Sequence, residues 1–222
     1  MPFDHKDQRL ARLYDREPSR VAYVDEAFRM DGRGDPFYIF GAVVVDFDAL
    51  DDLRDDLLDI VEGDYWHTTK AFNDEPTKQK LRELTQYLAD EGSISLCTID
   101  TDPTHFGDKA DVRAYSFFSL ARVVAEQYGA ELLVYERRRE GEEEDADHRS
   151  ERQINAAEQT RDLRLHAGTP WSEPLLWVPD IIASTLRRSL AFQDDEWFEP
   201  LREKTTIYRA GSFETVRLVA QK

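Results

Sequence analysis

The chain has 222 residues, 41% of them hydrophobic, which suffices for the core of one domain and excludes wholesale disorder. Its only cysteine, Cys97, excludes an intramolecular disulfide framework and a zinc site built from cysteines. The net charge of −17 disfavours direct binding to a phosphate backbone, although acidic residues that hold divalent cations can reach phosphate through the metal.

The sequence shows no pattern typical of membrane insertion or secretion. The longest apolar run, 39–45, is too short to cross a bilayer. Residues 1–12 are mostly polar and lack the apolar region of a secretory signal. We therefore expect a cytoplasmic protein that does not contact a membrane.

The first part of the chain predicts two strands followed by two helices. Residues 1–19 are charged, with a weak apolar pattern, and predict a short helix or an N-terminal arm. Apolar runs at 21–26 and 37–46 predict strands that pair antiparallel across a glycine-containing turn. Leucines at helical spacing predict a helix over 50–61, and Asp74 opens a second one.

The rest of the chain alternates strands and helices. Strands are predicted at 94–99, 132–136 and 163–166, and helices at 112–128, 150–161 and 175–192. The acidic run near 141–147 predicts a loop, because dense like charges repel, and alternating segments predict a C-terminal hairpin over 205–219. This order predicts an α/β fold with a mixed central sheet flanked by helices, in a single domain over residues 20–222.

Acidic residues stand where apolar elements end. Asp25 and Glu26 follow the first strand, Glu136 ends the strand at 132–136, and Asp180 lies at the start of the last helix. Neighbouring strands can bring such residues to one edge of a sheet. Converging carboxylates are typical ligands of Mg²⁺ or Mn²⁺, and pairs of these ions promote phosphoryl transfer. The sequence therefore predicts a metal site formed by Asp25, Glu136 and Asp180.

Local geometry distinguishes the roles of these acids. Because side chains alternate along a strand, Asp25 and Glu26 point to opposite faces. We choose Asp25 as the ligand and place Glu26 next to the site, or as a ligand only where the strand bends. Proline is tolerated only in the first turn of a helix, so Pro179 predicts the helix start and puts Asp180 in that turn. There the helix dipole favours an ionised carboxylate.

His67 and Lys70 lie in an unusual segment, 64–72, between two predicted helices. They share one side of the segment if it is helical, and they point apart if it is extended. Near the carboxylates, His67 would handle protons and Lys70 would stabilise phosphate charge. The arginines at 137–139 and 187–188 are candidates for contacts with a phosphate backbone, or they are solvated groups paired with nearby acids.

Each of these observations also has a purely structural explanation. Acids suit the turns at strand ends, Asp180 can be a helix-end charge with an exposed tip, and a lone histidine is more often structural than catalytic. The sequence lacks the glycine motifs of nucleotide-binding loops and the Gly-x-Ser-x-Gly motif of α/β-hydrolases. The acidic residues are therefore the main indication of function.

Four segments, taken in order, resemble the bacterial family named domain of unknown function 3800. They are Tyr23–Ala27, the apolar strand 37–45, Trp66–Lys70 and Leu176–Ala183. The resemblance covers residues 20–192 and implies a ribonuclease H-like fold with an acidic site at Asp25, Glu26, His67 and Asp180. The chain departs from the family pattern at Pro179, where alanine is usual, and at Glu136, near where an aspartate is usual.

We therefore expect a Mg²⁺- or Mn²⁺-dependent nuclease or phosphodiesterase that contacts nucleic acid through its metal. The alternative is a non-catalytic binding or regulatory module that keeps the fold without metal. A third interpretation pairs the acids with arginines such as Arg187 or Arg20. The sequence leaves open DNA or RNA, endo- or exo-cleavage, and the oligomeric state.

Overall fold

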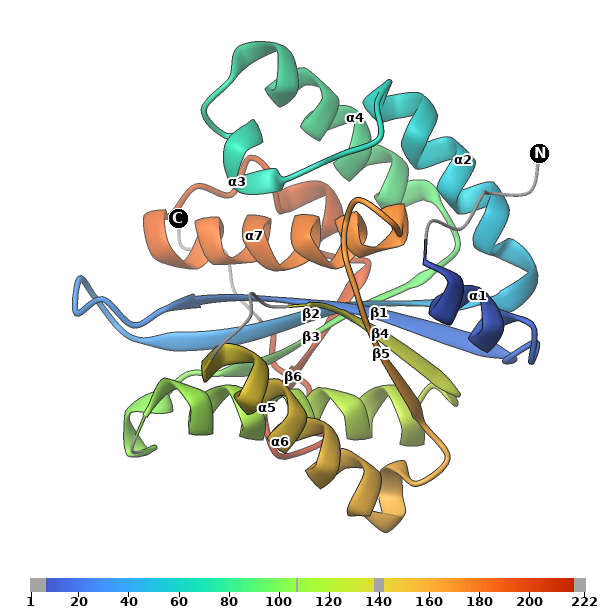
Figure 1. Cartoon of the computed structure of the whole chain (residues 1–222). Coiled ribbons are helices and arrows are strands. Elements are labelled where there is room, and N and C mark those ends of the chain that lie inside the picture. The colour runs from blue at the N-terminus through green and yellow to red at the C-terminus, as the bar shows by residue number, and fades with distance from the viewer. Residues whose placement is uncertain (1–6, 107, 138–141, 218–222) are drawn as a thin grey trace.

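Helices cover both faces of one central sheet in the computed structural model, which describes residues 7–106, 108–137 and 142–217 (Figure 1). The elements in chain order are α1 (Gln8–Tyr14), β1 (Arg20–Arg29), β2 (Phe37–Asp46), α2 (Leu50–Val61), α3 (Thr68–Ala71), α4 (Glu75–Asp90), β3 (Ile94–Asp100), α5 (Lys109–Glu126), β4 (Leu132–Glu136), α6 (Glu142–Ala156), β5 (Arg164–Gly168), α7 (Trp177–Phe192) and β6 (Thr205–Arg209).

The strands of the described residues form one sheet in the order β5-β4-β1-β2-β3-β6. The first three strands of the chain pair antiparallel, whereas β4, β5 and β6 each run parallel to a neighbour. The sheet is therefore mixed, and the predicted α/β class with a mixed central sheet flanked by helices is confirmed. The ribonuclease H-like assignment stays a prediction. The residue bounds predicted for the domain stay a prediction.

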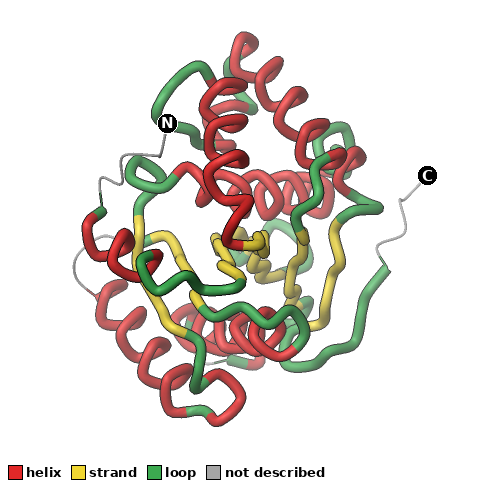
Figure 2. The backbone as a smooth tube through the Cα atoms, turned by 90° about the vertical axis from the view of Figure 1, so that its right-hand side faces the viewer, coloured by secondary structure: helices red, strands yellow, loops and turns green. Residues whose placement is uncertain are grey.

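The sheet separates two apolar layers. Val21 and Tyr23 of β1 belong to the layer that contains α1, α2, α4 and α7. Ala22 and Val24 belong to the layer that contains α5 and α6. Figure 2 shows these helices on either side of the strands. Successive residues of β1 alternate between the layers, as a strand requires, and this alternation decides which way the acids at its far end point.

Most predicted elements are present within a few residues of their expected positions. The predicted N-terminal helix is α1, with Leu10 and Tyr14 buried, and residues 1–6 lie outside the described part. The last helix begins at Trp177, two residues before Pro179, and follows a 3-10 turn at Pro174–Leu176. None of the described helices is long and apolar enough to cross a membrane, and the cytoplasmic location stays a prediction.

The prediction of a loop near 141–147 is wrong. Residues 142–147 belong to α6, while Gly141 lies outside the described residues. Glutamate has a high helix propensity, and Asp147 is buried in an ion pair with Arg113 that neutralises part of the acidic run. The helix predicted at 150–161 therefore begins earlier, and it ends at Ala156.

The C-terminal hairpin is observed in part. β6 forms its first arm, and Thr215 makes an isolated antiparallel bridge with Tyr208. The Val216 N–H donates to the carbonyl of Ile207 at 2.7 Å. Residues 218 and 219, where the second arm was predicted to end, lie outside the described residues.

Helix α7 approaches the sheet closely at Gly41 in β2. A Cβ atom at this position would lie 2.9 Å from the carbonyl oxygen of Pro179 and 3.2 Å from the Cβ of Ala183. Gly41 is paired across the sheet with Asp25 of β1. The missing side chain thus lets the first turn of α7 pack beside Asp25, and that turn carries Asp180.

Replacing Gly41→Ala should lower the free energy of unfolding by about 1–3 kcal/mol, because the new methyl group meets backbone atoms that cannot move independently of α7. Urea denaturation measures the loss. The control is Gly92→Ala, since a Cβ there has nothing within 4 Å, and it should change stability by less than about 1 kcal/mol. Equal stabilities of the two variants would contradict the packing argument.

A buried ion pair fixes the segment that leads into α7. Both Glu173 and Arg54 are almost inaccessible, and their two hydrogen bonds measure 2.9 and 3.0 Å. The hydroxyl of Tyr14 donates to Glu173 at 2.8 Å and lies 2.7 Å from the hydroxyl of Tyr23. Burial and the charge of Glu173 raise the pKa values of both tyrosines. One network therefore joins α1, β1, α2 and the approach to α7.

Glu173→Gln should destabilise the fold by about 3 kcal/mol or more, because it removes the buried carboxylate that pairs with Arg54 and keeps the pair with the exposed Asp51. Thermal and urea unfolding report the effect. Glu196→Gln is the matched control, since it breaks an exposed pair with Arg82 and should cost less than about 1 kcal/mol. Similar losses of unfolding free energy in the two variants would contradict the argument that breaking a buried ion pair costs more than breaking an exposed one.

Candidate active site

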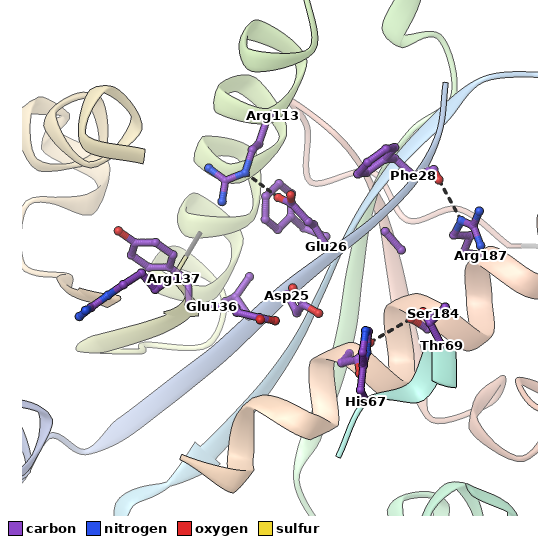
Figure 3. A pocket seen from close by; sticks show the side chains of 15 residues that line it. Asp25, Glu26, Phe28, His67, Thr69, Arg113, Glu136, Arg137, Ser184 and Arg187 are labelled. Carbon is purple, nitrogen blue, oxygen red and sulfur yellow. Dashed lines mark hydrogen bonds and ion pairs between the residues drawn. The ribbon is translucent and has the colours of Figure 1, made fainter. Parts of the chain in front are cut away.

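A cavity of about 530 Å³ opens between the second half of β1, the end of β4 and the first turns of α7 (Figure 3). Its lining combines acidic, basic and aromatic side chains from β1, β2, α3, α5, β4 and α7, from the segment before α3 and from the residue after β4. The residues are Val24, Asp25, Glu26, Ala27, Phe28, Phe40, His67, Thr69, Arg113, Tyr135, Glu136, Arg137, Asp180, Ser184 and Arg187. Five of the six predicted site residues line this cavity, with Glu26 on a different side from the other four. Two of the predicted arginines, Arg137 and Arg187, line it as well.

Asp25 and Glu136 come from neighbouring parallel strands. The parallel register ends with Val24 opposite Tyr135, and the two acids are the next residues along their strands. Glu136 is the last residue of β4, whereas β1 continues to Arg29, so the prediction that Asp25 and Glu26 follow the first strand is wrong. Tyr23 and Val134, two residues earlier, both belong to the apolar layer beneath α7. Alternation therefore directs both carboxylates to the α7 side of the sheet.

Asp180 joins them from above through the first turn of α7. Its Oδ2 accepts a hydrogen bond from the Thr68 N–H at 2.9 Å, and its Oδ1 accepts one from the Ser184 hydroxyl at 3.0 Å. The Nδ1 atom of His67 lies 3.6 Å from Oδ2. The side chain of Asp180 is 13% exposed, so these partners compensate for most of its lost hydration.

His67 occupies the N-cap position of α3 in an extended conformation, and its side chain is 42% exposed. The interaction with Asp180 raises the pKa of His67, partial burial opposes the shift, and the charge of Glu136 adds to it. The imidazolium form is therefore favoured beside the two acids. A histidine at this position can hold a proton near the cavity around neutral pH.

Glu136 lies in a less favourable environment than Asp180. Burial raises its pKa first, and the negative charge of Asp180 raises it further, while His67 opposes the shift. Two carboxylates on one side of a cavity repel each other, and a nearby cation relieves that repulsion. The site therefore attracts positive charge.

Glu26 faces the opposite layer, as strand alternation predicted. Its carboxylate accepts a hydrogen bond from Arg113 at 2.7 Å, and Arg113 is only 4% exposed at its side chain. Arg113 also pairs with Asp147 of α6. Glu26 thus holds an arginine at the cavity wall instead of joining the other three carboxylates.

The basic residues of the prediction separate into two groups. Arg187 lines the cavity, and its Nε donates to the Phe28 carbonyl at 2.9 Å, whereas Arg188 pairs with Asp194. Arg137 also lines the cavity, and residues 138 and 139 lie outside the described residues. Lys70 is not part of the cavity lining; its ammonium lies 5.5 Å from the ring centre of Tyr65.

The third interpretation paired the acids with arginines, for instance Arg187 or Arg20, and these two arginines have other partners in the structure. Arg187 donates to a backbone carbonyl, and Arg20 pairs with Asp46 at 2.7 Å. The same interpretation does describe Glu26, through Arg113. Glu26 is therefore paired with an arginine on one face of the sheet, while Asp25 and Glu136 lie on the α7 face.

Sequence analysis missed Arg113 and Ser184. Arg113 stands among the apolar residues of α5, where a charged side chain at a buried helical position is the one available indication of a buried partner. Ser184 lies four residues after Asp180, one helical turn away, which is the spacing for a hydrogen bond on the same face. Neither residue type is distinctive without the fold.

The carboxylates of Asp25, Glu136 and Asp180 suit a hard divalent cation, because such ions take oxygen ligands. Among the residues that the structure describes, no three or more His, Cys, Asp or Glu side chains form a group ready to hold a metal ion. Both oxygens of Asp180 already accept hydrogen bonds. The donor chemistry therefore fits a cation, whereas a preformed metal geometry is not observed in the described part of the chain.

The chain was compared with protein families, curated proteins and solved structures. No family model and no curated protein matches it. Among solved structures, it is similar to a chain of the PCNA:RNase HII complex from Archaeoglobus fulgidus. The two are 16% identical, the match covers 83% of this chain and 77% of that one, and the TM-score is 0.47. A likeness at this level concerns the general course of the backbone and says nothing of substrate or reaction.

Asp180→Asn should lower the pKa values of both His67 and Glu136, because the charge of Asp180 raises each of them. The raised pKa of His67 stabilises the fold below its ordinary pKa of about 6.5, and this contribution disappears as pH rises through the folded value. NMR titration of the metal-free protein measures both groups. Asp55→Asn, on the exposed face of α2, is the control and should move neither pKa.

Proposed function

We propose that this protein is a divalent-cation-dependent phosphodiester hydrolase that acts on nucleic acid. The observation that supports this most is the meeting of Asp25, Glu136 and Asp180, from three separate elements, on one side of a single cavity. Arg137 and Arg187 line the same cavity. Carboxylates for a cation and guanidinium groups for phosphate are the two components that such a reaction needs.

In this proposal Asp25, Glu136 and Asp180 hold Mg²⁺ or Mn²⁺. When bound, the cation supplies charge stabilisation to the phosphoryl group and a lowered pKa for an attacking water. Arg187 is oriented by its bond to the Phe28 carbonyl and would bind a phosphate oxygen in the cavity. His67 holds its Nδ1 3.6 Å from Asp180 Oδ2 and, when protonated, would offset the negative charge of the carboxylates.

Glu26 and Lys70 have supporting roles in the proposal. Glu26 positions Arg113 at the cavity wall through their 2.7 Å ion pair. Lys70 stands outside the cavity lining and would stabilise the charge of a neighbouring phosphate along a bound strand. The net charge of −17 repels nucleic acid, so cations and these basic residues would supply the local attraction.

We also propose that the chain is a member of the family named domain of unknown function 3800. The proposal is supported by the order of its four motifs. All four contribute lining residues to one cavity, namely Asp25, Phe40, His67 and Asp180.

A second candidate function is a binding module that has the fold without the metal. Asp180 is satisfied by the Thr68 N–H and the Ser184 hydroxyl, which favours a structural role for this acid. This candidate predicts ligand binding that does not require a cation.

Asp25→Asn and Glu136→Gln should each weaken Mn²⁺ binding at least about tenfold, since loss of even an outer partner of a metal ligand commonly costs that much. Calorimetric titration of Mn²⁺ measures affinity, and cleavage of end-labelled DNA and RNA oligonucleotides measures activity. Both variants should lose cleavage while they keep the wild-type circular dichroism spectrum.

Asp55→Asn is the matched control, because it removes one negative charge from an exposed position on α2. It should bind Mn²⁺ and cleave as the wild type does. A folded wild type that gives no Mn²⁺ heat and no cleavage contradicts the hydrolase proposal. Binding of oligonucleotides in EDTA without cleavage in Mn²⁺ would then favour the binding module.

A further inference from the structure

The segment before α3 alternates between the core and the cavity side. Trp66 is 4% exposed, and its indole N–H donates to the Thr68 hydroxyl at 2.9 Å. His67, the next residue, is extended and lines the cavity. Tyr65 precedes the buried tryptophan and is 46% exposed. Alternation along an extended chain therefore directs Tyr65 and His67 to the same outer side.

Tyr65 stands two residues before His67, which lines the cavity, although Tyr65 is not itself part of the lining. Burial raises the pKa of its hydroxyl, and the charges of Glu136 and Asp180 raise it further. The ammonium of Lys70 lies 5.5 Å from the ring centre. An aromatic ring with a lysine against it thus borders the mouth of the acidic cavity.

A large exposed aromatic ring needs an explanation at such a position. The neighbouring Trp66 is buried and already anchors this segment in the apolar core, so Tyr65 is not needed for that purpose. Tyr65 adds a flat surface, and Lys70 adds a positive charge, beside a cavity that contains acids and arginines. Exposed aromatic rings with adjacent basic side chains are the elements by which proteins bind single-stranded nucleic acid.

We propose that Tyr65 stacks on an unpaired base next to the phosphate held in the cavity, and that Lys70 contacts the phosphate that follows. This inference rests on the proposed function and adds the class of substrate, which is single-stranded DNA or RNA. In a duplex both faces of each base are covered by neighbouring bases, so Tyr65 has no face to contact. The ring of phenylalanine would serve as well as that of tyrosine, because stacking uses the face and not the hydroxyl.

Fluorescence anisotropy with labelled single strands and duplexes of the same sequence tests the inference. Ca²⁺ takes oxygen ligands with looser geometry than Mg²⁺, so titrations in Ca²⁺ measure binding without cleavage. Titrations in EDTA show whether binding requires a cation. Tyr65→Ala should weaken single-strand binding about tenfold, whereas Tyr65→Phe should retain it. Single strands should bind more tightly than duplexes to the wild type.

Phe213→Ala is the matched control, because Phe213 is 38% exposed and follows β6, the strand at the opposite edge of the sheet from β5. It should leave binding unchanged. Equal binding by Tyr65→Ala and the wild type, equal binding of duplex and single strand, or no single-strand binding at all overturns the inference. A wild type that binds single strands through Tyr65 but shows neither Mn²⁺ heat nor cleavage supports the inference and contradicts the hydrolase proposal.

Discussion

The first turn of α7 lies against the backbone of β2 at Gly41, and the geometry of the cavity depends on this contact. Any side chain at that position would push α7 away from the sheet. Because Gly41 pairs with Asp25, the close approach brings the first turn of α7, which carries Asp180, next to the middle of β1. The Arg54–Glu173 pair fixes the chain just before this helix, so both the depth and the start of α7 are determined.

The sequence contains enough information for the sheet and for the main acids. The apolar runs of β1, β2 and β4 predict strands, and parallel neighbours bring the residues at their ends together. Asp25 and Glu136 could therefore be chosen from pattern alone. Alternation also assigned Glu26 to the other face, where it pairs with Arg113.

Contacts between distant residues account for what could not be predicted. The acidic run of α6 looks like a loop until Arg113, from another helix, pairs with Asp147. Gly41 looks like any glycine in a strand until α7 lies over it. Lys70 and His67 could share one side or point apart, since the choice depends on the extended conformation of His67 before α3.

Helix α3 contains four residues, which is too short for a helix to be stable without contacts to the rest of the fold. Its first turn depends on the Thr68 N–H bound to Asp180 and on the burial of Trp66. The same carboxylate that faces the cavity therefore also sets the local unfolding equilibrium of this short segment. Loss of this carboxylate would therefore favour opening of the chain around Tyr65 and His67. The stability of this part of the cavity wall thus depends on Asp180.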